Sequence, residues 1–200
     1  HSHEITTKPI DGQLFAEPAQ TLQERNEARR NTIYDRCKKA AEIANNLDEP
    51  CVVWCNLNAE SELLHSLIDG AVEVRGSDDI RQKAQSMIDF ADKKIKCLVT
   101  KPKIAGFGMN WQETRHCIFV GLSDSWESYY QAIRRQWRFG QKRTVHCHII
   151  SADTEGAVTE NIRRKNEQNK EQSSAMMKQM AEFMSVHICG AKNEFTEIGR

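Results

Sequence analysis

The sequence predicts an α/β protein whose sheet is mostly parallel and carries helices on both sides. Short apolar segments recur between residues 51 and 150, and stretches with helical periodicity, each about 10–15 residues long, separate them. Charged residues make up 28% of the chain and apolar residues 39%, which is typical of a globular domain. No apolar run approaches the roughly 18 residues that a membrane-spanning helix needs.

The chain begins with a segment, residues 1–20, that is expected to be irregular. The first three residues, His-Ser-His, are read as an artificial or truncated start and left out of the predicted fold. Thr21 and Glu24 have the spacing of a capping box, which predicts the start of a helix. Apolar side chains then recur at helical spacing: Ile33, Cys37, Ala40, Ala41, Ala44 and Leu47. The predicted helix ends near Asn45-Asn46, before Pro50.

The alternation of strands and helices then continues to residue 150. The predicted strands are 51–55, 71–75, 97–100, 117–120 and 145–150. Asn58 and Ser77 are suitable N-caps for the first two helices between these strands. The second of those helices has a predicted inner face formed by Ile80, Ala84, Met87, Ile88 and Ala91. The helix after the fourth strand carries Trp126, Tyr129, Tyr130, Ile133 and Trp137.

These elements predict a RecA-like three-layer domain over residues 21–154, with helical N- and C-terminal extensions. After residue 154 the pattern becomes polar and helical up to about Met184, so residues 155–200 are predicted to form a helical extension. Met176, Met177, Met180 and Met184 lie on one side of this helix. A methionine stripe at this spacing favours a packing face over a cofactor site.

Cysteine and charge patterns limit the possible functions. The chain has 7 cysteines, an odd number found mostly in apolar segments, which favours free thiols in a reducing cytoplasm. Cys51 and Cys55 lack a second pair at zinc-site spacing, so no metal site is expected. The 28 basic and 28 acidic residues cancel. However, residues 93–112 and 128–152 contain only basic charges, which indicates either a positive surface or merely a solvated basic face.

Three loops contain residues with binding chemistry. In parallel α/β sheets, ligands bind at the carboxyl ends of the strands, where Asn56-Leu-Asn58 and the segment 100–110 are expected. Gln131, Arg135 and Arg138 are spaced i, i+4 and i+7, which predicts a single helical face. Arginine binds phosphate through two parallel hydrogen bonds, although the same arginines could instead pair with acids on a neighbouring helix.

In their order along the chain, these segments resemble the C-terminal lobe of superfamily 2 helicases. The segment Gln131-Ala-Ile-Arg-Arg-Gln-Trp-Arg-Phe-Gly-Gln141 is similar to the last motif of the Swi/Snf-like branch. The complete sequences of these loops are similar to those of helicases from bacteriophages and prophages. The sequence departs from the Swi/Snf pattern in two ways: Arg134 stands where an acid is usual, and the loop of residues 100–110 is one residue longer.

The resemblance implies a role for each matching residue. Arg135 and Arg138 would face the γ-phosphate of ATP across a cleft between two lobes, with Arg138 as the arginine finger. The other implied contacts are with the nucleotide (Gly108, Asn110 and Gln131) and with nucleic-acid strand phosphates (Asn56, Asn58, Thr100, Lys101 and Lys103).

Two elements of such a motor are missing from these 200 residues. There is no Gly-x-x-x-x-Gly-Lys-Ser/Thr segment and no Asp-Glu-x-His or Asp-Glu-Ala-Asp box, which in this class hold the phosphates and the magnesium ion. The resemblance therefore implies that ATP and Mg²⁺ are held mainly by an N-terminal RecA-like lobe located upstream in a longer protein. The 200 residues alone are expected to be inactive.

The expected partners are that lobe and a nucleic acid, with DNA favoured over RNA and no membrane, in the cytoplasm of a bacterium or a phage-infected cell. One alternative is a helicase lobe that has become a non-catalytic nucleic-acid or protein scaffold. Another is an unrelated α/β domain, such as a nuclease or a nucleotide-sugar enzyme, but we find no pair of carboxylates suited to a metal in its strand-end loops.

Overall fold

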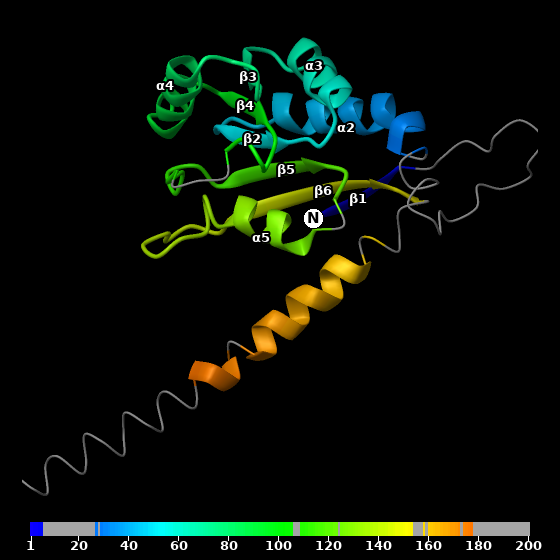
Figure 1. Cartoon of the computed structure of the whole chain (residues 1–200), viewed down its shortest axis with the longest axis vertical. Coiled ribbons are helices and arrows are strands. Elements are labelled where there is room, and N and C mark those ends of the chain that lie inside the picture. The colour runs from blue at the N-terminus through cyan, green and yellow to red at the C-terminus, as the bar shows by residue number, and fades with distance from the viewer. Residues whose placement is uncertain are drawn as a thin grey trace, which may run out of the picture. The chain divides into compact units, whose positions relative to one another are not determined.

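The computed structural model describes residues 1–5, 27, 29–105, 109–123, 125–153, 158, 160–172 and 174–177. The chain separates into two compact units, residues 1–160 and 161–200. The first unit contains the sheet and its helices and is described first (Figure 1).

The first unit is built on a six-stranded sheet with the order β1-β6-β5-β2-β4-β3. All of the strand pairs in the described residues run parallel, which confirms the predicted α/β fold with a mostly parallel sheet. The strands are β1 (Ser2–Ile5), β2 (Cys51–Trp54), β3 (Ala71–Val74), β4 (Cys97–Thr100), β5 (His116–Val120) and β6 (His146–Ala152).

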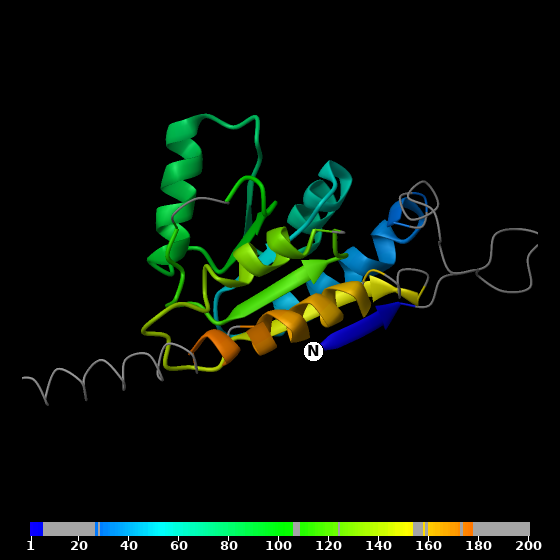
Figure 2. The same ribbon diagram turned by 60° about the horizontal axis from the view of Figure 1, so that its bottom comes forward.

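The edge strand β1 was not expected from the sequence. Residues 2–5 pair in parallel with β6, with Ser2 opposite Ile149 and Ile5 opposite Ala152, and Figure 2 shows the two strands side by side. The interpretation of residues 1–20 as irregular is therefore wrong for residues 2–5, because four residues with little apolar character can still form a strand beside an existing edge. Residues 6–20 and the capping box Thr21–Glu24 lie outside the described residues.

Two helices cover one face of the sheet. Alternate residues of the central strands point to this face, where they form the main core with α2 (Ile33–Asn45) and α3 (Asn58–Leu67). The predicted periodicity of α2 is confirmed, because Cys37, Ala40, Ala41 and Ala44 are buried. The small side chains allow this helix to lie close to the sheet.

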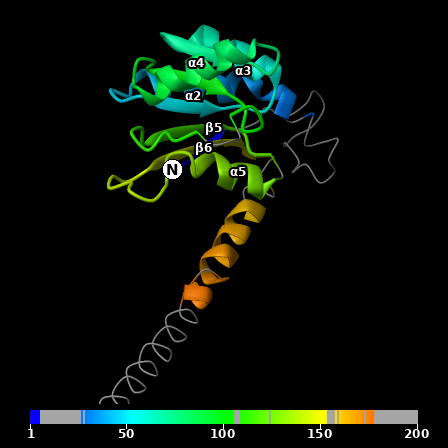
Figure 3. The ribbon, with the colours of Figure 1, turned by 60° about the vertical axis from the view of Figure 1, so that its left-hand side comes forward.

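The opposite face carries α4 (Ile80–Ala91) and α5 (Trp126–Ile133). Aromatic rings fill this side: Phe119 of β5 lies 4.9 Å from Tyr129 of α5, and Phe90 of α4 lies 5.1 Å from Trp111, measured between ring centroids. Figure 3 shows β5 and β6 between α2 and α5. Three layers are therefore present, as predicted.

Helix α4 differs from its predicted packing. Its N-cap is Asp79, whose side chain accepts a hydrogen bond from the amide of Arg81, and not Ser77. On the predicted inner face only Met87 is buried, whereas Ile80 is 78% and Ile88 47% exposed. The helix follows β3 at the edge of the sheet, so only one narrow side of it meets the core.

In the second unit, residues 161–172 and 174–177 are helical. Arg163 and Glu167 form an ion pair of 3.0 Å along this helix. Met176 and Met177 are exposed, while Met180 and Met184 lie outside the described residues. The boundary at residue 154 stays a prediction.

Candidate functional site

Four of the predicted nucleic-acid ligands lie together at the carboxyl ends of the central strands. Asn56 and Asn58 follow β2, and Thr100 and Lys101 end and follow β4; we call these four residues the strand-end cluster. Nζ of Lys101 donates a hydrogen bond of 2.6 Å to Oδ1 of Asn58. This contact joins the two loops, so the cluster is organised before any ligand binds.

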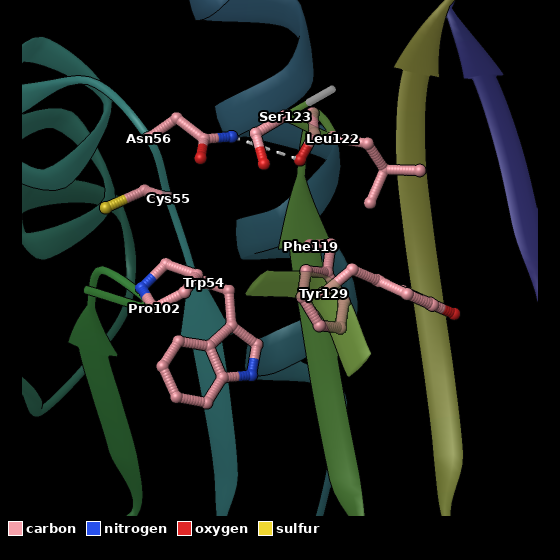
Figure 4. A pocket seen from close by; sticks show the side chains of 9 residues that line it. Trp54, Cys55, Asn56, Pro102, Phe119, Leu122, Ser123 and Tyr129 are labelled. Atoms are coloured by element: carbon pink, nitrogen blue, oxygen red, sulfur yellow. Dashed lines mark hydrogen bonds between the residues drawn. The ribbon is translucent and has the colours of Figure 1, made fainter. Parts of the chain in front are cut away.

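The side chain of Asn56 points toward a third loop, which follows β5. Its Nδ2 donates to the carbonyl oxygen of Gly121 at 3.4 Å (Figure 4). The pocket around it has a volume of about 10 Å³ and holds nothing larger than a water molecule. Burial raises the pKa of the Cys55 thiol in this pocket to about 12, so Cys55 does not serve as a nucleophile at neutral pH.

Thr100 lies at the predicted place, but its hydroxyl group does not face solvent. The residue is fully buried, and Oγ1 donates a hydrogen bond of 3.1 Å to the carbonyl oxygen of Val74 in β3. The prediction that the Thr100 hydroxyl directly contacts a strand phosphate is therefore wrong, because this hydroxyl is buried and bonded to Val74. The backbone amides after Thr100 stay as the predicted donors, and Lys103 is exposed in the turn that follows β4.

A wider polar hollow of about 350 Å³ opens beside Lys101 and Asn58. Its charged lining residues are Lys101, Arg75, Glu62 and Glu73, and Arg75 is paired with Glu73 at 2.7 Å. Because two acids balance two bases, the hollow itself is not a strongly positive site. The positive charge of Lys101 lies at its rim, where it meets the strand-end cluster.

The second group of predicted ligands lies in residues 134–141, which we call the arginine segment. Helix α5 ends at Ile133, and residues 134–136 form turns. The amides of Arg135 and Gln136 donate to Ala132 and Ile133 through bonds that span three residues. The prediction that Gln131, Arg135 and Arg138 share one helical face is therefore wrong, because the helix ends before the arginines.

The tighter turns nevertheless bring the two arginines close together. Arg135 is 9% exposed, and burial, followed by the positive charge of Arg138, lowers the pKa of Arg135. Arg138 is exposed, and its Nη1 donates to the carbonyl oxygen of Met109 at 3.4 Å. Among the described residues Arg138 has no carboxylate partner, so the alternative of an ion pair with a neighbouring helix does not apply to it there.

The loop after β4 also reaches the arginine segment. The amide of Trp111 donates to the carbonyl oxygen of Arg135 at 2.9 Å, which places Asn110 beside the arginine segment. Asn110 is exposed, and its Oδ1 accepts a hydrogen bond from the amide of Gln112. Gly108 lies outside the described residues. Gln131 is exposed in the last turn of α5.

Two glutamines that sequence reasoning did not single out hold the arginine segment in place. Gln136 is fully buried, and its Nε2 donates to Oγ1 of Thr114 at 2.9 Å and to the carbonyl oxygen of His116 at 3.0 Å. Nε2 of Gln141 donates to the carbonyl oxygen of Gln112 at 2.6 Å. An amide residue directly after Arg135 was the available signal, but only the end of the helix turns Gln136 inward.

The two groups occupy different ends of the strands. His116 is the first residue of β5, so the bond from Gln136 places the arginine segment toward the amino ends of the strands. The strand-end cluster lies at their carboxyl ends. Lys101 of the strand-end cluster and Asn110, which lies beside the arginine segment, belong to the same stretch of chain between β4 and β5.

The described residues contain no group of three or more histidine, cysteine or acidic side chains arranged to hold a metal ion. No described helix combines the length and apolar character needed to cross a membrane.

Comparison with solved structures identifies the fold. Residues of this chain superpose on the C-terminal part of the Fun30 ATPase domain with a TM-score of 0.55 and 19% identity, covering 65% of this chain and 44% of that one. The C-terminal domain of the DEAD-box protein Dbp5 gives a TM-score of 0.56 at 14% identity, covering 66% and 78% of the two chains. The sheet and its helices are thus a RecA-like domain.

Sequence comparison gives the family. The protein named CHROMATIN REMODELING 20 from Arabidopsis thaliana is 33% identical over 98 residues, which is 48% of this chain but only 6% of that protein. Residues 33–140, more than half of the chain, match the model of the helicase conserved C-terminal domain. The chain therefore belongs to the helicase C-terminal domain family of superfamily 2.

Proposed function

We propose that this chain is the second motor lobe of an ATP-driven helicase or translocase that moves on DNA. Arg135 and Arg138 supply guanidinium groups to the γ-phosphate of ATP, and the strand-end cluster contacts backbone phosphates. The nucleotide and its magnesium ion are held mainly by a first lobe. The match to a protein named for chromatin remodelling favours DNA over RNA as the substrate.

One observation carries this proposal: two adjacent guanidinium groups, of which the exposed one has no carboxylate partner among the described residues. Like charges at short distance are unfavourable unless an anion is bound between them. The triphosphate of ATP is such an anion. Charge that develops on the transferred phosphoryl group is stabilised by positioned arginines.

The surface around Arg138 also suits a partner that covers it. Phe139 is fully exposed and Trp137 is 52% exposed, with the guanidinium of Arg134 lying 5.4 Å from the centroid of the Trp137 ring. Exposed aromatic side chains beside charged groups are typical of interaction surfaces. Closure of a first lobe over this segment would bury them and bring Arg138 to the nucleotide.

The strand-end cluster supports the second part of the proposal. Asn58 is exposed and already bonded to Lys101, and it is the first residue of α3, so the cation lies near a helix N-terminus, where the first backbone amides have no intrahelical acceptor. Contacts with phosphates are independent of base sequence and weaken with salt. Alternating grip on such phosphates, coupled to closure of the two lobes, would move the motor along a strand.

The test is an Arg138→Ala substitution in the protein that carries both lobes, with Lys142→Ala as a control that removes a nearby exposed cation. We expect Arg138→Ala to reduce ATP turnover by roughly a thousandfold or more with nearly unchanged affinity for a DNA oligonucleotide. Unchanged turnover would refute the assignment of Arg138 as the arginine finger, whereas absence of ATP turnover in the unmodified two-lobe protein would favour a nucleic-acid or protein scaffold. The purified 200 residues alone should show no magnesium-dependent ATPase activity.

A further inference from the structure

A fully buried ion pair lies beneath the strand-end cluster. Nη1 of Arg36 in α2 and Oε1 of Glu60 in α3 are 2.9 Å apart, and their side chains are 0% and 1% exposed. Removing two such charges from water is expensive, and hydrophobic residues of similar size can stabilise a core as well or better. A pair of this kind therefore calls for a role in addition to stability.

Glu60 uses its second oxygen to hold the loop that follows β2. Oε2 accepts hydrogen bonds from the backbone amides of Asn56 at 2.9 Å and Leu57 at 3.0 Å. Leu57 occupies the N-cap position of α3 and has no side-chain acceptor, so Glu60 performs the capping from inside the first turn. The backbone that carries Asn56 and Asn58 is thereby attached to a buried carboxylate.

Arg36 attaches the same carboxylate to two other segments. Its Nε donates to Oγ1 of Thr32 at 3.1 Å, and its Nη2 donates to the carbonyl oxygen of Arg29 at 2.5 Å. Arg29 in turn donates from Nη2 to the carbonyl oxygen of Leu122, also at 2.5 Å. The N-terminal end of α2 is therefore connected to the loop after β5.

Gly121 shows how closely this guanidinium approaches that loop. A Cβ atom at this position would lie 2.5 Å from Nη1 of Arg36, and the backbone has φ +73°, a conformation that favours glycine. The carbonyl oxygen of Gly121 accepts the hydrogen bond from Asn56 (Figure 4). The ion pair thus lies where the loops after β2 and β5 meet.

We propose that Arg36 and Glu60 are positioning residues for nucleic-acid binding, which rests on the proposed function of the strand-end cluster. Their ion pair holds the Asn56–Asn58 backbone and the Gly121–Leu122 loop in one fixed arrangement. Neither residue reaches a ligand, because both are fully enclosed. Their effect passes through the amides of Asn56 and Leu57 and through the side chain of Asn56.

The experiment measures binding of a fluorescent DNA oligonucleotide to the 200-residue chain across a series of KCl concentrations. Glu60→Gln keeps the shape of the side chain but cannot accept from both amides and also pair with Arg36. We expect its affinity to fall about tenfold, the effect of losing roughly one charge-assisted hydrogen bond. The salt dependence should stay unchanged, because Lys101 retains its charge.

Two further variants separate positioning from stability. Ile68→Ala removes a buried side chain at the opposite end of α3, so it should lower the unfolding midpoint without weakening binding. Arg36→Lys keeps a positive charge but cannot reach Thr32, Arg29 and Glu60 together, and should reduce affinity less than Glu60→Gln. Circular dichroism identifies a temperature at which every variant is folded. Equal affinity of Glu60→Gln, Arg36→Lys and wild type would overturn the positioning role.

Lys101→Ala separates failure of this inference from failure of the proposed function. If Lys101→Ala weakens binding but the Arg36 and Glu60 variants do not, only the positioning role is wrong. If Lys101→Ala also has no effect, the proposed strand contact itself is wrong. Should Glu60→Gln not fold, hydrogen exchange on the wild-type chain decides: amides of Asn56 and Leu57 that exchange as fast as an open loop would contradict the proposed hydrogen bonds.

Discussion

The strand-end cluster and the arginine segment lie at opposite ends of the same strands and differ in how their side chains are held. In the strand-end cluster, Lys101 is bonded to Asn58, Asn56 to Gly121 and Thr100 to Val74. In the arginine segment the backbone is fixed by Gln136 and Gln141, but among the described residues the guanidinium of Arg138 makes only a 3.4 Å contact with a carbonyl oxygen.

This difference matches the ligands that we propose for each region. A strand of nucleic acid slides past many equivalent phosphates, so a preorganised surface with moderate positive charge suits it. In the proposed motor, a γ-phosphate is contacted only when the two lobes close. Arg138, which has no carboxylate partner among the described residues, would then meet the phosphate held by the other lobe. The strand-end cluster is held by hydrogen bonds within this chain, whereas the arginine segment is proposed to reach its ligand only when the first lobe closes over it.

After Arg138→Ala, the largest expected effect concerns Arg135. An Arg135→Lys substitution preserves the charge but loses the planar fork that binds two phosphate oxygens. In the protein with both lobes, we expect ATP turnover to fall about a hundredfold. This is less than the loss expected when an arginine finger is removed completely, because lysine keeps the positive charge. Oligonucleotide binding should not change. Equal losses in turnover and binding would show that the two regions are not separate.

A smaller effect is expected at Gln136, which holds the arginine segment without contacting a ligand. Gln136→Leu removes the bonds to Thr114 and His116 but also removes a buried Oε1 that has no partner among the described residues. We therefore expect a loss of only about 1–2 kcal/mol in the free energy of unfolding, measured by urea titration. ATP turnover should decrease while oligonucleotide affinity remains, because only the arginine segment loses its support.

At the other end of the strands, Lys101→Ala should weaken oligonucleotide binding by about tenfold and reduce the slope of log affinity against log salt by about one. Lys96→Ala is the matched control, because Lys96 is an exposed lysine at the amino end of β4. Titration by fluorescence anisotropy distinguishes the two. An equal reduction in slope for both variants would mean that the basic surface binds without a defined site.

The smallest expected effect is that of Thr100→Val. The buried hydroxyl donates one hydrogen bond to Val74, so its loss should cost about 1 kcal/mol of the free energy of unfolding. Affinity for the oligonucleotide should stay the same, since the hydroxyl does not face solvent. A clear loss of affinity without a loss of stability would restore the direct contact between Thr100 and a strand phosphate.

Particular elements show how far prediction from sequence reaches. The strands 51–54, 97–100 and 116–120 are apolar apart from Thr100 and His116, and their buried positions are recognisable because both faces of a central parallel strand are covered. Helix α4 was located correctly but not its buried side, since an edge helix meets the core along a narrow line only. Strand β1 was missed because four residues carry too little periodicity to predict a strand.

The candidate sites divide in a similar way. The residue types and the order of Asn56, Asn58, Lys101, Arg135 and Arg138 could be selected from the sequence, and the structure places them in two groups. The supporting residues Arg36, Glu60 and Gln136 were not selected. A charged or amide residue in a helical pattern is normally expected at the surface, and its burial depends on partners far away in the sequence.

By itself, the sequence determined the parallel α/β fold, the family and the identity of the candidate ligands, because hydrophobic periodicity and short motifs are local properties of the chain. Only the tertiary structure decided that α5 ends before the arginines, that the hydroxyl of Thr100 is enclosed and that a buried ion pair lies beneath Asn56. The physical reason is that the burial and pairing of a polar group depend on which distant segments surround it, and local patterns do not contain that information.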